Sequence, residues 1–223
     1  MLQLKDVTLV GVDCVNIERL ILAAEISQKE INFGAIKLLS SIRCNSPYII
    51  PIEPLKTVEQ YSEFMIKKLY QYIDTPFALV IQWDGFVLNP KGWRNQFLSY
   101  DYIGAPWNDK CVGNGGFSLR SRSLLKALSE DNTISQFHPE DFIICRVHRQ
   151  HLEKQGFLFA DDETALKFSI ESRPWDGQFG FHQTDISKSD FLSLLDKEWY
   201  SLMIESYINI HQCKINLQGQ RNY

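Results

Sequence analysis

Carboxylates and a histidine stand at points of this chain where they could hold a cation or move a proton. Asp84 follows an apolar segment, residues 77–82, within the run Gln82-Trp83-Asp84-Gly85. One carboxylate together with the phosphate oxygens of a ligand is a common way to hold Mg²⁺ or Mn²⁺. An Asp at the end of a strand, followed by a Gly with a positive φ, also makes an ordinary turn. The segment alone therefore leaves both explanations open.

Two further segments carry side chains suited to catalysis or metal binding. Glu140 and Asp141 follow Pro139, which is typical of the first turn of a helix. The helix dipole favours negative charge there, and it also keeps a carboxylate ionised, as a general base requires. His182 ends the run FGFH and is either a packed core histidine or a ligand for Mn²⁺ and similar metals.

Small and aromatic residues gather between these acids. The run DYIGAPW ends at Trp107, and the run GNGGFSLR follows it at residues 113–120. Small residues let the backbone approach a ligand closely, and exposed N–H groups can bind hydroxyls or phosphates. Trp107 could stack on the apolar face of a sugar. The alternative is a pair of tight turns between edge strands. The four loop residues of interest are Gly113, Asn114, Gly115 and Gly116.

Strand and helix patterns alternate through the first half of the chain. Strands are expected at residues 7–12, 35–39, 48–52 and 77–82, with helices at 17–26 and from a capping box at 57–60 to about 73. This alternation predicts an α/β fold with a mostly parallel central sheet, residues 77–82 being a central strand. Ligands bind at the carboxyl ends of such strands, which is where Asp13 and Asp84 lie.

The second half is less regular but shows no linker or repeat. Short strands are expected within residues 100–107 and 112–120, and helices at 121–128, 139–152 and 187–210. Asp161 and Asp162 suggest a solvated turn or a helix cap. The chain is expected to form one domain over residues 1–213, followed by a loose tail at 214–223.

Composition limits the classes of function. The 223 residues carry a formal net charge of −4 and no basic run, which argues against sequence-independent nucleic-acid binding. A diphosphate ligand then needs a local cation, and a divalent metal is the simplest source. Five cysteines without a C-x-x-C pair suggest neither a disulfide framework nor a zinc cluster. With no signal peptide or membrane-spanning pattern, the chain is expected to be cytoplasmic, and peripheral membrane contact stays open.

Together these segments resemble a known family. Asp84 after FALVIQ, then DYIGAPW, GNGGFSLR, PED and FGFH occur in this order in a family of uncharacterised proteins, DUF5672-type, that is classed as glycosyltransferase-like with the GT-A fold. The resemblance covers roughly residues 5–185. It implies a single-domain GT-A glycosyltransferase that uses a nucleotide-sugar donor, a hydroxyl acceptor such as a glycan, and Mn²⁺ or Mg²⁺, with a role in cell-surface polysaccharide or glycan synthesis.

The resemblance also implies roles for individual residues. Asp84 and His182 would hold the metal, Asp141 would be the catalytic base of an inverting displacement, and Glu140 would orient the donor or the acceptor. Gln82 stands where GT-A enzymes carry the first acid of an Asp-x-Asp motif. The donor or substrate would contact Asp13 in the nucleotide-base pocket, together with Gln82, Trp83, Trp107, Gly113, Asn114, Gly115 and Gly116.

Two other functions remain open at this point. Gln82, an amide in place of an acid, suggests a non-catalytic module of the same fold that binds a nucleotide or a glycan. A nucleotidyltransferase also uses strand-end carboxylates with Mg²⁺, but the Gly-rich basic loop that such enzymes carry near the N-terminus is missing from this sequence.

Overall fold

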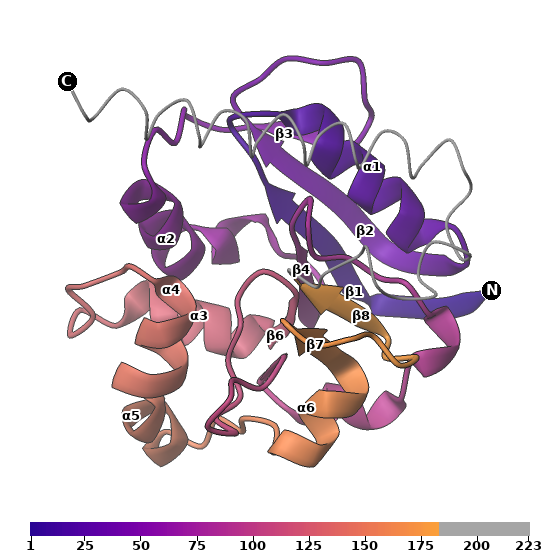
Figure 1. Cartoon of the computed structure of the whole chain (residues 1–223). Helices are drawn as coiled ribbons and strands as arrows, with labels where there is room; N and C mark the ends of the chain where they lie inside the picture. The colour runs from indigo at the N-terminus through magenta and orange to yellow at the C-terminus, as the bar shows by residue number, and fades with distance from the viewer. Residues whose placement is uncertain (183–223) are drawn as a thin grey trace, which may run out of the picture. The chain divides into compact units, whose positions relative to one another are not determined.

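A six-stranded sheet in the order β3-β2-β1-β4-β6-β5 organises the computed structural model, which describes residues 1–182 (Figure 1). The first four strands in this order pair in parallel, and β6 is antiparallel to both of its neighbours, so five of the six strands point in one direction. The α/β fold with a mostly parallel sheet is therefore confirmed. The strands are β1 (Leu2–Val12), β2 (Ile31–Ser40), β3 (Ile49–Pro51), β4 (Phe77–Ile81), β5 (Tyr102–Gly104) and β6 (Ser118–Ser121).

β4 lies in the middle of this sheet, as its apolar sequence predicts. It pairs in parallel with β1 and antiparallel with β6, so that Leu79 lies between Leu9 and Leu119. All of its residues except Phe77 are buried. Two covered faces explain the unbroken apolar run, because no position after Phe77 meets water.

The helices of the first half begin where expected. α1 (Ile17–Gln28) packs on β1, β2 and β4, and α2 (Val58–Lys67) begins at Thr57, whose hydroxyl accepts a hydrogen bond from the Gln60 amide. The expectation that α2 continues to about residue 73 is wrong. Helical geometry is lost at Lys68, and a 3₁₀ turn, η1 (Leu69–Tyr72), follows. The tighter turn brings both Leu69 and Ile73 into the core.

The helix expected over residues 139–152 is broken into three pieces. α4 (Glu140–Phe142) leads into a π-helical turn, η4 (Ile143–Val147), and then into α5 (Arg149–Lys154). Pro139 is the cap residue, with extended backbone angles. The first three residues of this π turn, from Ile143, are buried.

The remaining elements complete the described part of the chain. α3 (Arg122–Glu130) follows β6, and η2 (Pro90–Gly92) and η3 (Asn95–Ser99) are single 3₁₀ turns. Asp161 caps α6 (Asp162–Phe168) by accepting a hydrogen bond from the Thr164 amide, which confirms the expected helix cap. β7 (Ser169–Glu171) and β8 (Gly180–His182) form a second, two-stranded parallel sheet that the sequence does not predict.

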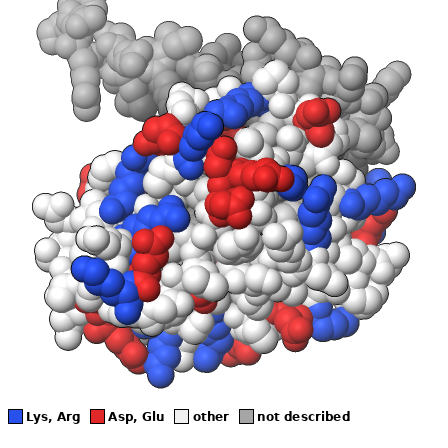
Figure 2. Space-filling view, turned by 90° about the horizontal axis from the view of Figure 1, so that it is seen from below, with Lys and Arg blue, Asp and Glu red and all other residues white. Residues whose placement is uncertain are grey.

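Some expectations fall on the part of the chain beyond residue 182. The predicted helix at 187–210, the domain end at 213 and the tail at 214–223 lie outside the described residues. Within residues 1–182, no helix combines the length and the apolar character that crossing a membrane requires. On the described part of the face in Figure 2, Lys and Arg side chains stand among Asp and Glu side chains, so charges of both signs are mixed there.

The central position of β4 gives a first prediction. Leu79→Ala removes a fully buried side chain between two other strands and should lower the free energy of unfolding by about 2–5 kcal/mol. Leu158→Ala is the matched control, because Leu158 is 57% exposed and should change that free energy by less than about 1 kcal/mol. Urea unfolding measures both. Equal losses in the two variants would contradict the central placement of β4.

Candidate active site at the carboxyl ends of the strands

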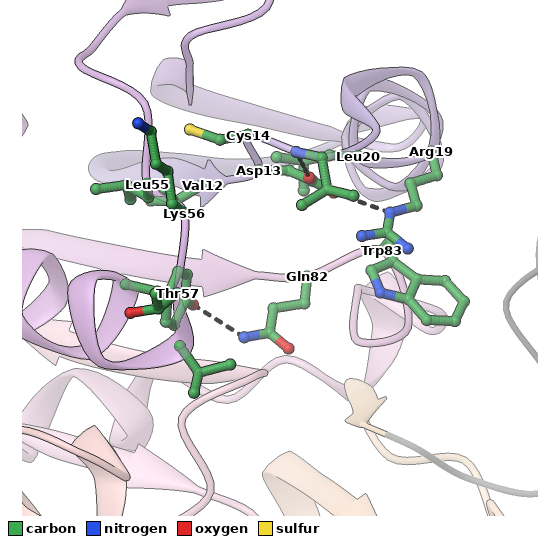
Figure 3. A pocket seen from close by; sticks show the side chains of 13 residues that line it. Val12, Asp13, Cys14, Arg19, Leu20, Leu55, Lys56, Thr57, Gln82 and Trp83 are labelled. Atoms are coloured by element: carbon green, nitrogen blue, oxygen red, sulfur yellow. Dashed lines mark hydrogen bonds and ion pairs between the residues drawn. The ribbon is translucent and has the colours of Figure 1, made fainter. Parts of the chain in front are cut away.

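A pocket of about 290 Å³ opens where β1 and β4 end (Figure 3). Carboxyl ends of parallel strands are the usual ligand-binding edge of such sheets. One part of its lining is apolar, with Val12, Leu20 and Leu55 among the residues. The polar or charged lining residues include Asp13, Arg19, Lys56, Thr57, Tyr61 and Gln82. An apolar pocket with a few converging polar groups is typical of a small-molecule site.

Asp13 shapes this pocket through its neighbours. Its Oδ1 accepts hydrogen bonds from the amides of Val15 and Asn16, at 2.7 and 2.9 Å, and thereby fixes the turn into α1. Its Oδ2 accepts a hydrogen bond from Arg19 Nε at 2.8 Å. The guanidinium of Arg19 lies 4.8 Å from the centre of the Trp83 ring. Asp13 thus positions Arg19 in the pocket, a residue that sequence reasoning missed because it is a lone cation within a helix.

Gln82 connects this pocket to the predicted metal ligands. Its Nε2 donates to Tyr61 Oη at 2.9 Å, and its Oε1 lies 3.2 Å from His182 Nε2. A tight turn follows, in which Gln82 and Gly85 exchange two backbone hydrogen bonds. The explanation of Gly85 by a positive φ is wrong, since among residues 1–182 only Gly156 and Gly177 are glycines with that conformation. Gly85 is small because a Cβ there would meet the His182 ring at 2.8 Å.

Asp84 and His182 come together although 98 positions separate them in the sequence (182 − 84). Asp84 Oδ1 lies 3.7 Å from His182 Nε2, and this oxygen is buried without a hydrogen-bond partner among residues 1–182. Such an orphaned oxygen is costly unless something binds it. The separation is long for a hydrogen bond, yet two atoms bound to one ion at about 2.0–2.3 Å lie about 3–4 Å apart. The geometry therefore fits a shared cation, whose presence stays a prediction.

The other side of the His182 ring meets two polar side chains. Nδ1 lies 2.9 Å from Asn114 Nδ2 and 3.3 Å from Glu171 Oε1. Glu171 is opposite His182 in the β7–β8 pair. Burial raises the pKa of the Glu171 carboxyl, but its interactions with the side chains of His182 and Asn114 outweigh burial and hold that pKa below its ordinary value. Glu171 is a further site residue that no motif in the sequence indicates.

The Gly-rich loop is buried and packs closely against neighbouring side chains. All four of its residues, 113–116, are buried, so the expectation of exposed N–H groups is wrong for this structure. A Cβ at Gly116 would lie 2.1 Å from His182 Nε2, and one at Gly115 would lie 2.1 Å from Glu140 Oε1. Asn114 has a left-handed φ of 55°, which Asn tolerates better than most residues. The loop is small because predicted site side chains press against it.

Trp107 packs against the start of this loop. A Cβ at Gly113 would lie 2.1 Å from the Trp107 ring, and the guanidinium of Arg146 lies 4.6 Å from the ring centre. Protein groups therefore already contact the ring. Its stacking on a sugar stays a prediction, as do the substrate contacts of Gly113, Asn114, Gly115 and Gly116.

The two acids at the start of α4 have different surroundings. Glu140 is buried, and its Oε1 lies 3.3 Å from Nη2 of Arg120, which is itself fully buried. Burial raises the pKa of the Glu140 carboxyl, and the charge of Arg120 opposes that shift. Asp141 is less buried, and its Oδ2 accepts a hydrogen bond from the Gly115 amide at 2.9 Å. The structure thus turns Glu140 inward and leaves Asp141 as the acid nearer to solvent.

The buried pair gives a second prediction. Glu140→Gln leaves the Arg120 charge without its carboxylate partner, which should lower the free energy of unfolding by about 3–5 kcal/mol. The matched control is Glu153→Gln, which removes an exposed helical pair with Arg149 and should cost less than about 1 kcal/mol. Thermal and urea unfolding compare the two. A Glu140→Gln protein as stable as the control would mean that the pair is not a structural tie.

Comparisons with known proteins identify a family but no activity. No curated protein matches the chain. The bifunctional IspDF from Campylobacter jejuni is similar at 14% identity and a TM-score of 0.42, over 69% of this chain, which spans only 48% of that protein. A glycosyltransferase involved in the glycosylation of the major capsid of PBCV-1 is similar at 14% identity and a TM-score of 0.45, over 84% and 96% of the two chains.

The galactosyltransferase LgtC, solved with donor and acceptor sugar analogs, is similar at 13% identity and a TM-score of 0.44, over 87% of this chain and 99% of that one. Likenesses at this level define neither a substrate nor an activity. A family model, described as "Protein of unknown function (DUF5672)", matches residues 48–182 and so includes β4, the Gly-rich loop, both acids of α4 and His182. Because this match covers more than half of the sequence, the chain belongs to that family.

Proposed function

We propose that this protein is a glycosyltransferase that moves a sugar from a nucleotide-sugar donor to a hydroxyl of an acceptor, such as a glycan of the cell surface. The supporting observation is one continuous set of contacts. It runs from the pocket through Gln82 to His182, which stands beside Asp84, and through Asn114 and Gly115 to Asp141. A binding pocket, a candidate cation site and a candidate base thus share one edge of the sheet.

The pocket suits the nucleoside part of the donor. Its apolar lining, with Val12 and Leu20, can cover a flat base, while Arg19 and Lys56 supply positive charge for polar or anionic groups. Gln82 lines the same pocket and contacts His182, so a nucleoside bound there would direct its diphosphate toward Asp84. The assignments of Asp13 and Trp83 to donor binding belong to this proposal.

The side chains around Asp84 fit a divalent cation, Mn²⁺ or Mg²⁺. Asp84 Oδ1 and His182 Nε2 would hold the ion, with the neutral Gln82 Oε1 beside them and ligand phosphate oxygens completing the set. Among residues 1–182, no three His, Cys, Asp or Glu side chains group as a metal cluster, so the diphosphate has to supply part of the coordination. Such an ion would neutralise the charge of the departing diphosphate as a Lewis acid.

Asp141 is the proposed general base. Its carboxylate lies at the beginning of α4, held by the Gly115 amide, and is accessible enough to take a proton from an acceptor hydroxyl. That hydroxyl would then attack the anomeric carbon in one displacement, which inverts the configuration there. Glu140 cannot easily share this task, because its carboxylate faces Arg120.

A screen of nucleotide-sugars tests the proposal as a whole. UDP-, GDP-, CMP- and dTDP-sugars are added with Mn²⁺ in a thermal-shift assay, and any ligand that raises the melting temperature is then tested for metal-dependent transfer or slow hydrolysis. Hydrolysis that a chelator stops would support a transferase. Binding without any turnover would instead support the non-catalytic module that Gln82 suggests. No shift with any donor would contradict both.

Removal of the proposed metal carboxylate gives a third prediction. Asp84→Asn keeps the shape of the side chain but removes its charge, so metal-dependent binding of a nucleoside diphosphate should be lost. Calorimetry with and without Mn²⁺ measures the effect. The matched control is Asp176→Asn, in an exposed segment, which should bind like the parent protein. Unchanged Mn²⁺ dependence in Asp84→Asn would remove this residue from the metal site.

Removal of the proposed base gives a fourth prediction. Asp141→Asn should lower turnover by about 10²–10⁴-fold, because the amide cannot accept the proton, while donor affinity stays nearly unchanged. Sugar transfer, or donor hydrolysis in the absence of a known acceptor, measures turnover. Glu140→Gln is the companion variant, assayed at a temperature where it is folded. Full activity in Asp141→Asn with loss only in Glu140→Gln would move the base to Glu140.

A further inference from the structure

We propose that Glu171 is a positioning residue that sets the tautomer of His182 for metal binding. In this role Glu171 accepts a hydrogen bond from His182 Nδ1–H, so that the lone pair of Nε2 faces Asp84. The inference rests on the proposed metal-dependent function and adds a residue to it. A carboxylate that accepts a hydrogen bond from a metal-ligating histidine orients the ring and makes it a better ligand.

Backbone pairing places Glu171 beside His182. The two residues are partners in the parallel β7–β8 pair, and Glu171 Oε1 lies 3.3 Å from His182 Nδ1. The Glu171 side chain is about one-fifth exposed (21%), and that of His182 is 8% exposed. The contact is therefore largely shielded from water. In such surroundings a charge-assisted hydrogen bond is stronger than at the surface.

The ring of His182 has little freedom to turn. Gly85 and Gly116 approach it so closely that a Cβ at either position would lie 2.8 and 2.1 Å from ring atoms. With the ring held between these backbones, the adjustable feature is which nitrogen carries the proton. A neutral imidazole has one N–H, so the partners of Nδ1 decide what Nε2 can offer.

Two partners of Nδ1 favour opposite tautomers. If Nδ1 is bare, it accepts from Asn114 Nδ2 at 2.9 Å, and Nε2–H donates to Gln82 Oε1 at 3.2 Å, which puts the proton on the atom that would bind the ion. If Nδ1 carries the proton, it donates a hydrogen bond to Glu171 Oε1 at 3.3 Å, and Nε2 offers a lone pair beside Asp84 Oδ1. The ring is neutral in both tautomers. Their exchange releases one proton from Nε2 to solvent and takes up one proton from solvent at Nδ1.

Asn114 has an alternative partner in the second arrangement. Its side chain helps to lower the pKa of the Glu171 carboxyl, which gives the amide an acceptor other than Nδ1, so it need not oppose the Nδ1 proton. An ionised Glu171 is an acceptor only and cannot stabilise the bare Nδ1. Without Glu171, Asn114 would be the remaining polar partner of Nδ1 among the described contacts, and the ring would favour the tautomer whose Nε2 is protonated.

The test compares Mn²⁺ binding in the full parent chain and in three glutamate variants, with a nucleoside diphosphate present, and His182→Gln serves as the variant without the imidazole. Glu171→Met keeps the length of the side chain but removes the acceptor, and Glu171→Gln keeps an acceptor oxygen without the charge. The matched control is Glu163→Met, the same change at a side chain that is 84% exposed. Mn²⁺ affinity is measured by electron paramagnetic resonance, and the nitrogen coupling of a bound imidazole is measured by spin-echo modulation.

We expect Glu171→Met to weaken Mn²⁺ binding by about 10–100-fold, with a smaller loss in Glu171→Gln and none in Glu163→Met. The nitrogen coupling should be present in the parent protein, absent in His182→Gln, and weakened in Glu171→Met even when Mn²⁺ is saturating. A purely structural role for Glu171 would not alter that coupling at saturation.

Two failures are distinguishable. A parent protein that binds no Mn²⁺ with any nucleoside diphosphate overturns the metal-dependent function and this inference with it. A parent protein that binds Mn²⁺ through His182, with the same affinity and coupling in Glu171→Met, overturns the role of Glu171 and leaves the proposed function intact.

Discussion

The ion pair between Arg120 and Glu140 ties the candidate site to the sheet. Arg120 belongs to β6 and is fully buried, so its charge requires partners inside the protein. It finds them in Glu140 at the start of α4 and in the Gly115 carbonyl of the loop. The same Gly115 donates its amide to Asp141. One buried cation therefore fixes the loop, the helix start and the carboxylate beside it.

Close backbone approach is the second constraint on this site. The loop glycines, which suggest a ligand cradle in the sequence, are required because Trp107, Glu140 and His182 pack against them. Because these three side chains occupy the space that a Cβ would take, the backbone of the loop limits where they can lie. Any larger residue there would have to displace a candidate functional group, so the small size of the loop residues follows from the packing of the site itself.

Periodicity and local chemistry explain which parts the sequence predicts. The apolar run of β4, the helical spacing of α1 and the caps at Thr57 and Asp161 are local signals, and all four are confirmed. Asp84 and His182 come together as the ordered motifs imply. Glu171 is different, because β7 and β8 have three residues each and pair across a loop. A pairing that depends on tertiary packing produces no periodic pattern in the sequence. The π turn that follows α4 produces none either.

Gln82 decides how much charge the protein offers to a cation. With an amide in that position, Asp84 is the one carboxylate among the described residues that faces His182 Nε2, and Glu171 lies behind the ring on the Nδ1 side. A site with one facing carboxylate attracts a free divalent ion less than a site with two, because each negative ligand that is missing weakens the Coulomb attraction for the ion. A diphosphate supplies the missing negative charge. Under the proposed function the ion and the donor therefore bind together, and the hydrogen bond from Gln82 to Tyr61 Oη links that event to the pocket where the nucleoside would lie.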